Sequence, residues 1–272
     1  MKKHSQPIKK IIFLTFFLVI IIISIAGLLL YSFGYHPPIL MYHHIQDLTN
    51  GDSRLFVSPK SFEQQMEFLK ENKYSVIGLE TLFDNIQQQK PIPYKTVALT
   101  FDDGYADNYL FAYPILKKNH FPATIFLAVS FIGTNGYLTW PQIQEMENNN
   151  IHFGNHTWSH QNLKEIPQTY AEQEIFKAKD LLSHFVKNPS SIFCYPVGAY
   201  NDTVKELVQA AGYRAAVSNS PNGEAPLTDR YAYRRIRISN SSNNKYIFSA
   251  EISGYYSSLS QLRKKKKHLT NP

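Results

Sequence analysis

One cysteine in 272 residues, Cys194, rules out a disulfide within the chain, so cysteine usage leaves the redox compartment open. The sequence also lacks a Gly-x-Ser-x-Gly motif, which argues against a serine hydrolase of the α/β-hydrolase type, and it contains no internal repeat. A lone cysteine between apolar neighbours in a strand is more often a small core residue than a nucleophile. We therefore look for the chemistry of this chain in other residue types.

The excess of positive charge is confined to the two ends of the sequence. The formal net charge is +7, with 28 Lys and Arg against 21 Asp and Glu. Four lysines lie in the first ten residues and five basic residues form the run 263–267, which leaves 19 basic residues against 21 acidic ones between them. The middle of the chain therefore lacks the basic surface that nucleic-acid binding requires. The run 263–267 is interpreted as a solvated tail, with contact to an envelope polyanion as the alternative.

Residues 11–33 form an apolar run without a charged side chain. This length is enough to cross a bilayer and exceeds the core of a typical signal peptide. Lys2, Lys3, Lys9 and Lys10 precede the run, so we expect the N-terminus in the cytoplasm and the rest of the chain outside the membrane. No small-x-small cleavage pattern stands out near residues 31–36, so an uncleaved anchor is expected, with a cleaved signal as the alternative.

Beyond this run, apolar β-branched stretches alternate with amphipathic ones, a pattern typical of a single domain built on a parallel sheet. The clearest helix is expected at 170–186, where Ile175, Ala178, Leu182 and Phe185 recur at helical spacing. Other helices are expected at 59–70, 79–89, 108–118, 141–148 and 202–210, and strands at 39–45, 95–101, 123–128, 151–155, 191–195, 213–217 and 234–238.

Two carboxylates follow the strand expected at 95–101, in the motif Thr-Phe-Asp-Asp-Gly-Tyr at 100–105. Adjacent strand residues point to opposite faces, so Asp102 and Asp103 could not share one site from the middle of a strand. At the end of the strand, where Gly104 turns the chain, both can reach one cavity. The carboxyl ends of parallel strands are where α/β proteins place their sites. A solvated acidic turn at a helix start is the alternative interpretation.

Two histidines follow another expected strand end, in the motif His-Thr-Trp-Ser-His at 156–160. On a helical turn, His156 and His160 would share one face, which suits metal ligation, although such a pair is more often structural or solvated. Together the motifs predict a metal held by Asp103, His156 and His160, with Asp102 left as a general base. Two imidazoles and one carboxylate leave coordination positions open for water and substrate, which favours metal-assisted hydrolysis of an amide or ester.

The two motifs resemble those of the NodB-type polysaccharide deacetylases, carbohydrate esterase family 4. Cys-Tyr-Pro-Val-Gly at 194–198 resembles the third motif of that family, and the likeness spans roughly residues 36–240. The resemblance implies a distorted (β/α) barrel of about seven parallel strands. It implies that Asp102 is the base and that Asp103, His156 and His160 bind a divalent metal, with Zn first and Co, Ni, Mn or Fe as alternatives. It also implies that the backbone N–H of Val197 helps stabilise the oxyanion.

The sequence departs from that family in three places. The third motif normally begins with an arginine that orients the base, and Cys194 stands there instead. The Asp-Trp of the fourth motif has no clear counterpart, and no usable C-terminal histidine follows His184 to act as general acid. The strand expected at 39–45 ends in His43 and His44, which resembles the subgroup acting on poly-β-1,6-N-acetylglucosamine, where missing motifs lie on the N-terminal side. We carry the acid role to His43, with His44 as the competitor and a satisfied core histidine as the structural alternative.

The leading hypothesis is a single-pass membrane protein whose extracellular domain removes N-acetyl groups from an N-acetylglucosamine polymer. Peptidoglycan deacetylation, O-acetyl ester hydrolysis, Fe(II) oxygenation and non-catalytic glycan binding are the alternatives; the last would follow if Cys194 in place of arginine disabled the base. Aromatic candidates for substrate contact are Tyr105, Trp158 and Tyr195, of which Trp158 is favoured. The expected segments are a cytoplasmic N-terminus at 1–10, an anchor at 11–33, the catalytic domain at 36–255 and a basic tail at 256–272.

Overall fold

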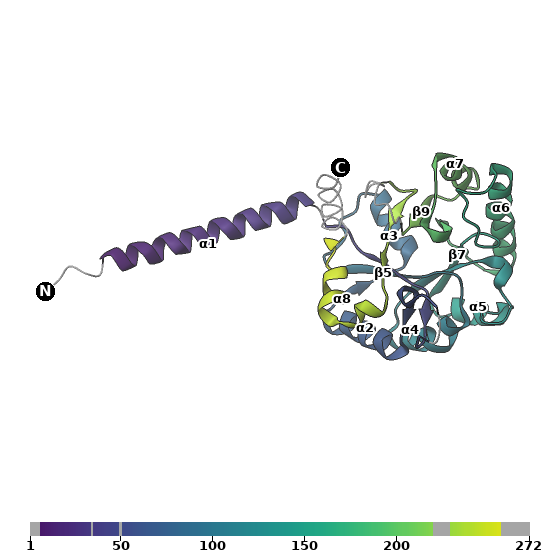
Figure 1. The fold of residues 1–272 in the computed structure, drawn as a ribbon, viewed down its shortest axis with the longest axis horizontal. Helices are drawn as coiled ribbons and strands as arrows, with labels where there is room; N and C mark the ends of the chain where they lie inside the picture. Colours follow the sequence, from purple (N-terminus) through teal and green to yellow (C-terminus); the bar gives the residue numbers. More distant parts are fainter. Residues whose placement is uncertain (1–5, 34, 49–50, 220–228, 257–272) are drawn as a thin grey trace. The chain divides into compact units, whose positions relative to one another are not determined.

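The computed structural model describes residues 6–33, 35–48, 51–219 and 229–256, and the chain divides into two compact units, Met1–His36 and Pro37–Pro272. In the first unit, the predicted apolar run forms one continuous helix, α1 (Gln6–Phe33) (Figure 1). Its segment Lys10–Gly27 is long and apolar enough to cross a membrane. The basic tail predicted at 256–272 lies, apart from its first residue, outside the described residues.

The second unit alternates strands and helices, as the sequence pattern predicts. Its helices are α2 (Pro59–Glu71), α3 (Leu79–Gln87), α4 (Tyr113–Asn119), α5 (Trp140–Glu147), α6 (Gln168–Phe185), α7 (Asp202–Ala210) and α8 (Lys245–Glu251). Its strands are β1 (Ile39–Tyr42), β2 (His44–Ile45), β3 (Phe56–Val57), β4 (Ser75–Val76), β5 (Thr96–Phe101), β6 (Ala123–Leu127), β7 (Ile151–Asn155), β8 (Ile192–Cys194), β9 (Ala215–Ser218), β10 (Tyr233–Arg234) and β11 (Ile236–Arg237). Short helical turns are η1 (Ser53–Leu55), η2 (Asn108–Ala112), η3 (Val129–Phe131), η4 (Pro196–Gly198) and η5 (Asn240–Asn243).

Eight parallel strands form a nearly closed barrel in the order β10-β9-β8-β7-β6-β5-β1-β11, with β4 added beside β5. The strands occupy the middle of the unit and the helices lie outside them (Figure 1). The predicted distorted barrel of parallel strands is thus confirmed. It is built from eight strands, where about seven were expected. The short β2 and β3 pair separately with each other.

One short segment of chain joins the two edges of the sheet. β10 pairs with β9 at one edge and β11 pairs with β1 at the other, although only Arg235 separates β10 from β11. The N–H of Arg235 itself donates to the carbonyl of Ser218, and the N–H of Ile238 donates to that of Met41. This closing segment therefore places residue 235 between the first and last strands of the barrel.

The alternation of side chains along β5 sorts them into two layers. Val97, Leu99 and Phe101 pack in the larger apolar cluster with residues of the surrounding helices, among them Phe62, Met66 and Leu69 of α2. Ala98 belongs to a second cluster, which includes Leu79, Leu82 and Phe83 of α3 and the first residues of β1, β8 and β9. Because alternate strand residues share a face, Thr100 and Asp102 continue the Ala98 row toward the carboxyl end of the strands. The barrel interior is therefore apolar near α3 and polar at the opposite end.

Candidate functional site

The two carboxylates of the first motif lie directly beyond the end of β5, as predicted. Asp102 and Asp103 are both buried. Asp103 has a φ of 73° and Gly104 a φ of 79°, so the backbone turns through the left-handed region as soon as the strand ends. A Cβ at residue 104 would lie 2.7 Å from Cδ2 of Leu127, so a larger residue would have to displace that side chain as well as adopt a strained conformation. This turn sends the two neighbouring carboxylates to different parts of one site.

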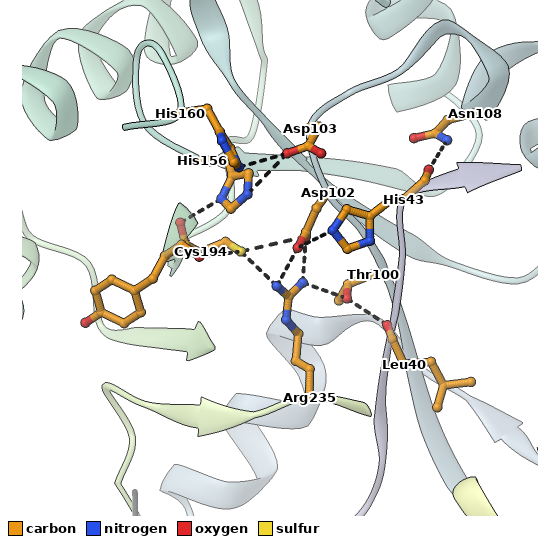
Figure 2. A network of polar contacts seen from close by, with 11 residues as sticks. Leu40, His43, Thr100, Asp102, Asp103, Asn108, His156, His160, Cys194 and Arg235 are labelled. Carbon is orange, nitrogen blue, oxygen red and sulfur yellow. Dashed lines mark hydrogen bonds and ion pairs between the residues drawn. The ribbon is translucent and has the colours of Figure 1, made fainter. Parts of the chain in front are cut away.

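Asp103 faces the two histidines of the second motif (Figure 2). Its Oδ1 lies 3.2 Å from Nε2 of His160 and 3.5 Å from Nε2 of His156. The donor atoms of the three residues all lie within 4.8 Å of one another. Oδ1 of Asp103 is buried and makes its ion-pair contacts with these two imidazole nitrogens. An oxygen and two imidazole nitrogens that converge in this way fit a divalent transition metal such as Zn²⁺.

The second motif forms a loop and not a helical turn. β7 ends at Asn155, and Thr157 and His160 have φ values of 70° and 58°. Oδ1 of Asn155 accepts the N–H of Thr157 at 2.6 Å, and Oγ1 of Thr157 accepts the N–H of His160 at 3.0 Å. The histidines converge because two left-handed residues fold the loop back, and these side chains supply the hydrogen bonds that a helix would have made.

Neighbouring elements fix the orientation of this loop. Nδ1 of His156 lies 2.9 Å from the carbonyl oxygen of Cys194, which leaves Nε2 to face Asp103. Glu174 of α6 accepts from the N–H of Ser159 at 2.7 Å and from its hydroxyl at 2.6 Å. Burial lowers the pKa of His156 to about 4, so its ring is neutral at neutral pH, which is the form that binds metals.

Asp102 is held by an arginine that sequence reasoning missed. Nη1 and Nη2 of Arg235 donate to the two carboxylate oxygens of Asp102, each at 2.6 Å (Figure 2). Nη1 also donates to Oγ1 of Thr100 at 3.1 Å, and Nη2 lies 3.0 Å from Sγ of Cys194. Burial by itself raises the pKa of Asp102, but the guanidinium of Arg235, together with His156 and His43, outweighs it and holds the pKa below its usual value. Asp102 is therefore a charged acceptor at neutral pH.

Cys194 stands where the orienting arginine of the family is expected, and it lies beside Asp102. Its thiol lies 3.7 Å from Oδ1 of Asp102, and it is fully buried. Burial raises the pKa of this thiol well above its ordinary value, so it is not a thiolate at neutral pH. The small side chain leaves room for a guanidinium that arrives from the closing segment of the barrel instead of from β8.

The two histidines after β1 point in different directions, as strand alternation predicts. Nε2 of His43 lies 3.9 Å from Oδ2 of Asp102, so His43 faces the site (Figure 2). His44 turns toward Asp107, with Nδ1 at 2.6 Å from Oδ2, and its ring stacks between Phe56 and Tyr105. Burial lowers the pKa of His43. Of the two candidates for the general acid, only His43 is next to the base.

Val197 adopts a backbone conformation that valine rarely occupies. It lies in the turn η4, with φ 50° and ψ 10°, directly after the Cys-Tyr-Pro segment that ends β8. A β-branched residue in this region is strained by about 1–2 kcal/mol. Its side chain is 52% exposed, so packing does not compensate for the strain. Strain of this kind at a strand end is consistent with a backbone that is shaped for function.

The three aromatic candidates for substrate contact have little free ring surface. Tyr105 is stacked on one face by His44 and on the other by Tyr137, at centroid distances of 3.6 and 5.1 Å. Tyr195 is only 1% exposed, and its hydroxyl donates to the carbonyl of Tyr231, so it packs as a core residue with almost no surface for a substrate. The ammonium of Lys177 covers Trp158 at 3.5 Å from the ring centroid. Trp158 also lines a cavity of about 300 Å³ with Tyr170 and Gln161.

Comparisons with known proteins point to one family. The sequence profile of a family described as polysaccharide deacetylase matches residues 89–216. YxkH, a Bacillus subtilis protein provisionally named a polysaccharide deacetylase, is 36% identical over 202 residues, which are 74% of this chain and 71% of YxkH. A poly-β-1,6-N-acetyl-D-glucosamine N-deacetylase of Staphylococcus epidermidis is 28% identical over 199 residues, or 68% of each chain.

The fold is also similar to solved structures. The deacetylase PplD of Streptococcus pyogenes, solved in complex with acetate, superposes with a TM-score of 0.72 at 29% identity. The likeness covers 79% of this chain and 97% of PplD. The closed barrel, and not only the motifs, is thus shared with a protein described as a deacetylase.

Proposed function

We propose a substrate for this chain, which belongs to the polysaccharide deacetylase family and is an enzyme of that family. We propose that it removes N-acetyl groups from an N-acetylglucosamine polymer, with poly-β-1,6-N-acetylglucosamine as the preferred substrate. The observation that carries the proposal is the position of His43. This residue comes from the strand before the first motif and lies 3.9 Å from Asp102. The relatives named for the β-1,6-linked polymer support the same substrate.

Asp103, His156 and His160 would hold the metal, with Zn²⁺ the first candidate because its usual ligands are nitrogen and oxygen donors of this kind. When bound, a metal of this type lowers the pKa of water toward about 7 and polarises the acetamide carbonyl. The protein contributes a buried oxygen and two imidazoles that already point at one place, so little rearrangement is needed for binding.

The remaining residues would divide the proton transfers between them. Asp102 takes a proton from the attacking water. It is charged, and both of its carboxylate oxygens accept hydrogen bonds from Arg235. His43 passes a proton to the amine that leaves, since an amine is a poor leaving group without one. The N–H of Val197 donates to the oxygen that gains negative charge. The products are acetate and a free amino sugar.

Arg235 also bears on the alternative of a non-catalytic glycan-binding protein. That alternative rested on the cysteine that stands where an orienting arginine is expected. Because Arg235 makes a bidentate contact with Asp102 from the closing segment, the base has an orienting arginine after all. The carboxylate of Asp102, which is outside the proposed metal-binding set, also argues against an Fe(II) oxygenase. Such an enzyme needs only two histidines and one carboxylate as ligands.

We further propose that α1 is an uncleaved membrane anchor with the barrel on the extracellular side. The support is the length of the apolar helix and the lysines that precede it. In intact cells, protease added outside should then digest the barrel, and the protein should stay with membranes after a high-salt wash. Recovery of a soluble protein that begins near residue 35 would contradict the anchor.

The substrate is tested by acetate release from four glycans at equal concentration of acetyl groups: β-1,6-linked N-acetylglucosamine oligomers, β-1,4-linked oligomers, peptidoglycan and an O-acetylated glycan. We expect the β-1,6-linked oligomers to react fastest, and the Asp102→Asn protein serves as the inactive control. Faster release from peptidoglycan would replace the substrate while keeping the reaction. Release from O-acetylated glycan alone would make the protein an esterase.

A further inference from the structure

The ring of His43 is not held in place by hydrogen bonds of its own. Its Nδ1 is buried and has no hydrogen-bond partner among the described residues. Its Nε2 lies 3.9 Å from Asp102, which is beyond hydrogen-bond distance. The position of this imidazole therefore has to be set by the backbone that carries it.

That backbone is fastened on both sides of His43 by two adjacent residues. Nδ2 of Asn108 donates to the carbonyl oxygen of His43 at 2.8 Å (Figure 2). Oδ1 of Asp107 accepts the N–H of Ile45 at 3.0 Å, and Oδ2 of Asp107 lies 2.6 Å from Nδ1 of His44. Each of the three residues 43–45 thus has a polar group bound by Asp107 or Asn108.

The two fastening residues are themselves rigid. Both are buried, and Nδ2 of Asn108 also donates to Oδ1 of Asp107 at 2.8 Å. They stand at the start of η2, a π-helical turn in which the N–H of Tyr113 donates to the carbonyl of Asn108. π-Helical turns are rare in proteins, and those that occur are often found at functional sites. The π-turn brings both side chains to the same stretch of backbone.

Stacking completes the arrangement around His44. Its ring lies 4.4 Å from that of Phe56 and 3.6 Å from that of Tyr105, at interplanar angles of 12° and 23°. The ring of His44 is therefore held in place by Asp107 and by the two aromatic rings. This leaves His43 as the residue that projects into the site.

We propose that Asp107 and Asn108 are positioning residues for His43, which they hold beside Asp102 by fixing the backbone of residues 43–45. The inference rests on the proposed function, because positioning matters for turnover only if His43 delivers a proton. Both residues would act only through this backbone. Displacement of a proton donor by about 1 Å costs on the order of 10²-fold in rate, so the effect should be large for the amide alone.

The kinetic test compares an amide with an activated acetate ester, whose leaving group needs no proton. For Asn108→Ala and for Asp107→Asn, which keeps size and one acceptor, we expect kcat on an N-acetylglucosamine oligomer to fall about 10–100-fold. KM and ester turnover should change less than about threefold. In a His43→Ala background the same substitutions should cause no further loss on the amide. Asn119→Ala is the matched control, since Nδ2 of Asn119 donates to the carbonyl of Ile115 at 2.9 Å, away from the site.

Equal losses on amide and ester, or losses that multiply with His43→Ala, would make the role of these residues merely structural and overturn the proposal. A second readout does not depend on turnover. In NMR spectra of histidine-labelled protein, Asn108→Ala and Asp107→Asn should shift the ring signals of His43, and Asn119→Ala should not. Unmoved His43 signals would also overturn the proposal, whereas a wild-type protein that releases no acetate would overturn the proposed function and leave this readout intact.

Discussion

Arg235 and Asp102, 133 residues apart in the sequence, form a buried bidentate ion pair with both N–O distances at 2.6 Å. The pair couples the closure of the barrel to the site, because Arg235 is the residue between the two strands that close the sheet. A buried aspartate can stay ionised only when a positively charged group pairs with it and donates hydrogen bonds to it. The same contact therefore stabilises the fold and prepares the base.

Removal of the guanidinium should destabilise the protein strongly. Arg235→Met leaves the carboxylate of Asp102 buried without its partner, which should lower the free energy of unfolding by about 3–5 kcal/mol. Adding Asp102→Asn removes the stranded charge, so the double variant should recover most of the lost stability without recovering activity. Urea denaturation measures both effects. Arg54→Met, at an exposed pair with Asp52, is the control and should change nothing measurable.

If Arg235→Met alone were as stable as the wild-type protein, the pair would not be the buried contact described above. If the double variant were less stable than Arg235→Met, the loss would come from packing and not from an unpaired charge.

Glu251 in α8 should make stability depend on pH. Its side chain is buried and Oε2 has no hydrogen-bond partner among the described residues. Burial raises the pKa of this carboxyl from 4.5 to about 7, although a hydrogen bond from Ser242 opposes the shift. The folded state thus retains a proton that the unfolded state loses, so the contribution is favourable at low pH and is lost as pH rises through about 7.

Glu251→Gln keeps the shape and cannot ionise, so it isolates this effect from that of other groups. The two proteins should differ little at pH 4, and the variant should become the more stable by up to about 3 kcal/mol above pH 7. Chemical denaturation of both proteins across this range measures the difference. A constant difference at all pH values would show that Glu251 does not titrate with a raised pKa.

Val197→Gly tests whether the strained turn acts through its backbone. Glycine adopts a φ of 50° without strain and keeps the N–H, while the lost side chain is half exposed. Relief of strain is partly offset by the greater freedom of the unfolded chain, so we expect a gain in stability of up to about 1 kcal/mol. Acetate release should stay within about threefold of wild type, whereas loss of a true oxyanion donor costs about 10²–10³-fold. A loss of that larger size in Val197→Gly would assign the role to the side chain.

The sequence predicted the barrel and the meeting of Asp103, His156 and His160 at one place because the signals are local. Each of these residues follows an apolar strand closely, and parallel strands bring their carboxyl ends to one edge. Strand alternation also sorted His43 from His44. The loop at 156–160 could not be predicted, because the spacing of two histidines does not distinguish a helical turn from a loop folded by left-handed residues such as Thr157.

Arg235 could not be predicted because its strands are only two residues each and its partner is remote. The one signal is an arginine between Tyr233 and Ile236 in a stretch otherwise expected to be a buried strand, where a charge requires a partner. The burial of Tyr195 could not be predicted for a related reason. Proximity to a motif in sequence does not tell which face of a strand end a side chain takes, and here it faces the helix layer with Phe193 and Tyr213.

The division of labour between the neighbouring carboxylates is the central claim, and one paired measurement tests it. Bound metal and acetate release are determined side by side for wild type, Asp102→Asn and Asp103→Asn, with His160→Ala as the reference for a lost ligand. Asp102→Asn should retain one metal per chain while acetate release falls about 10²–10⁴-fold. Asp103→Asn should lose metal as His160→Ala does. An Asp102→Asn protein without metal, beside an Asp103→Asn protein that keeps it, would reverse the two roles and contradict the account.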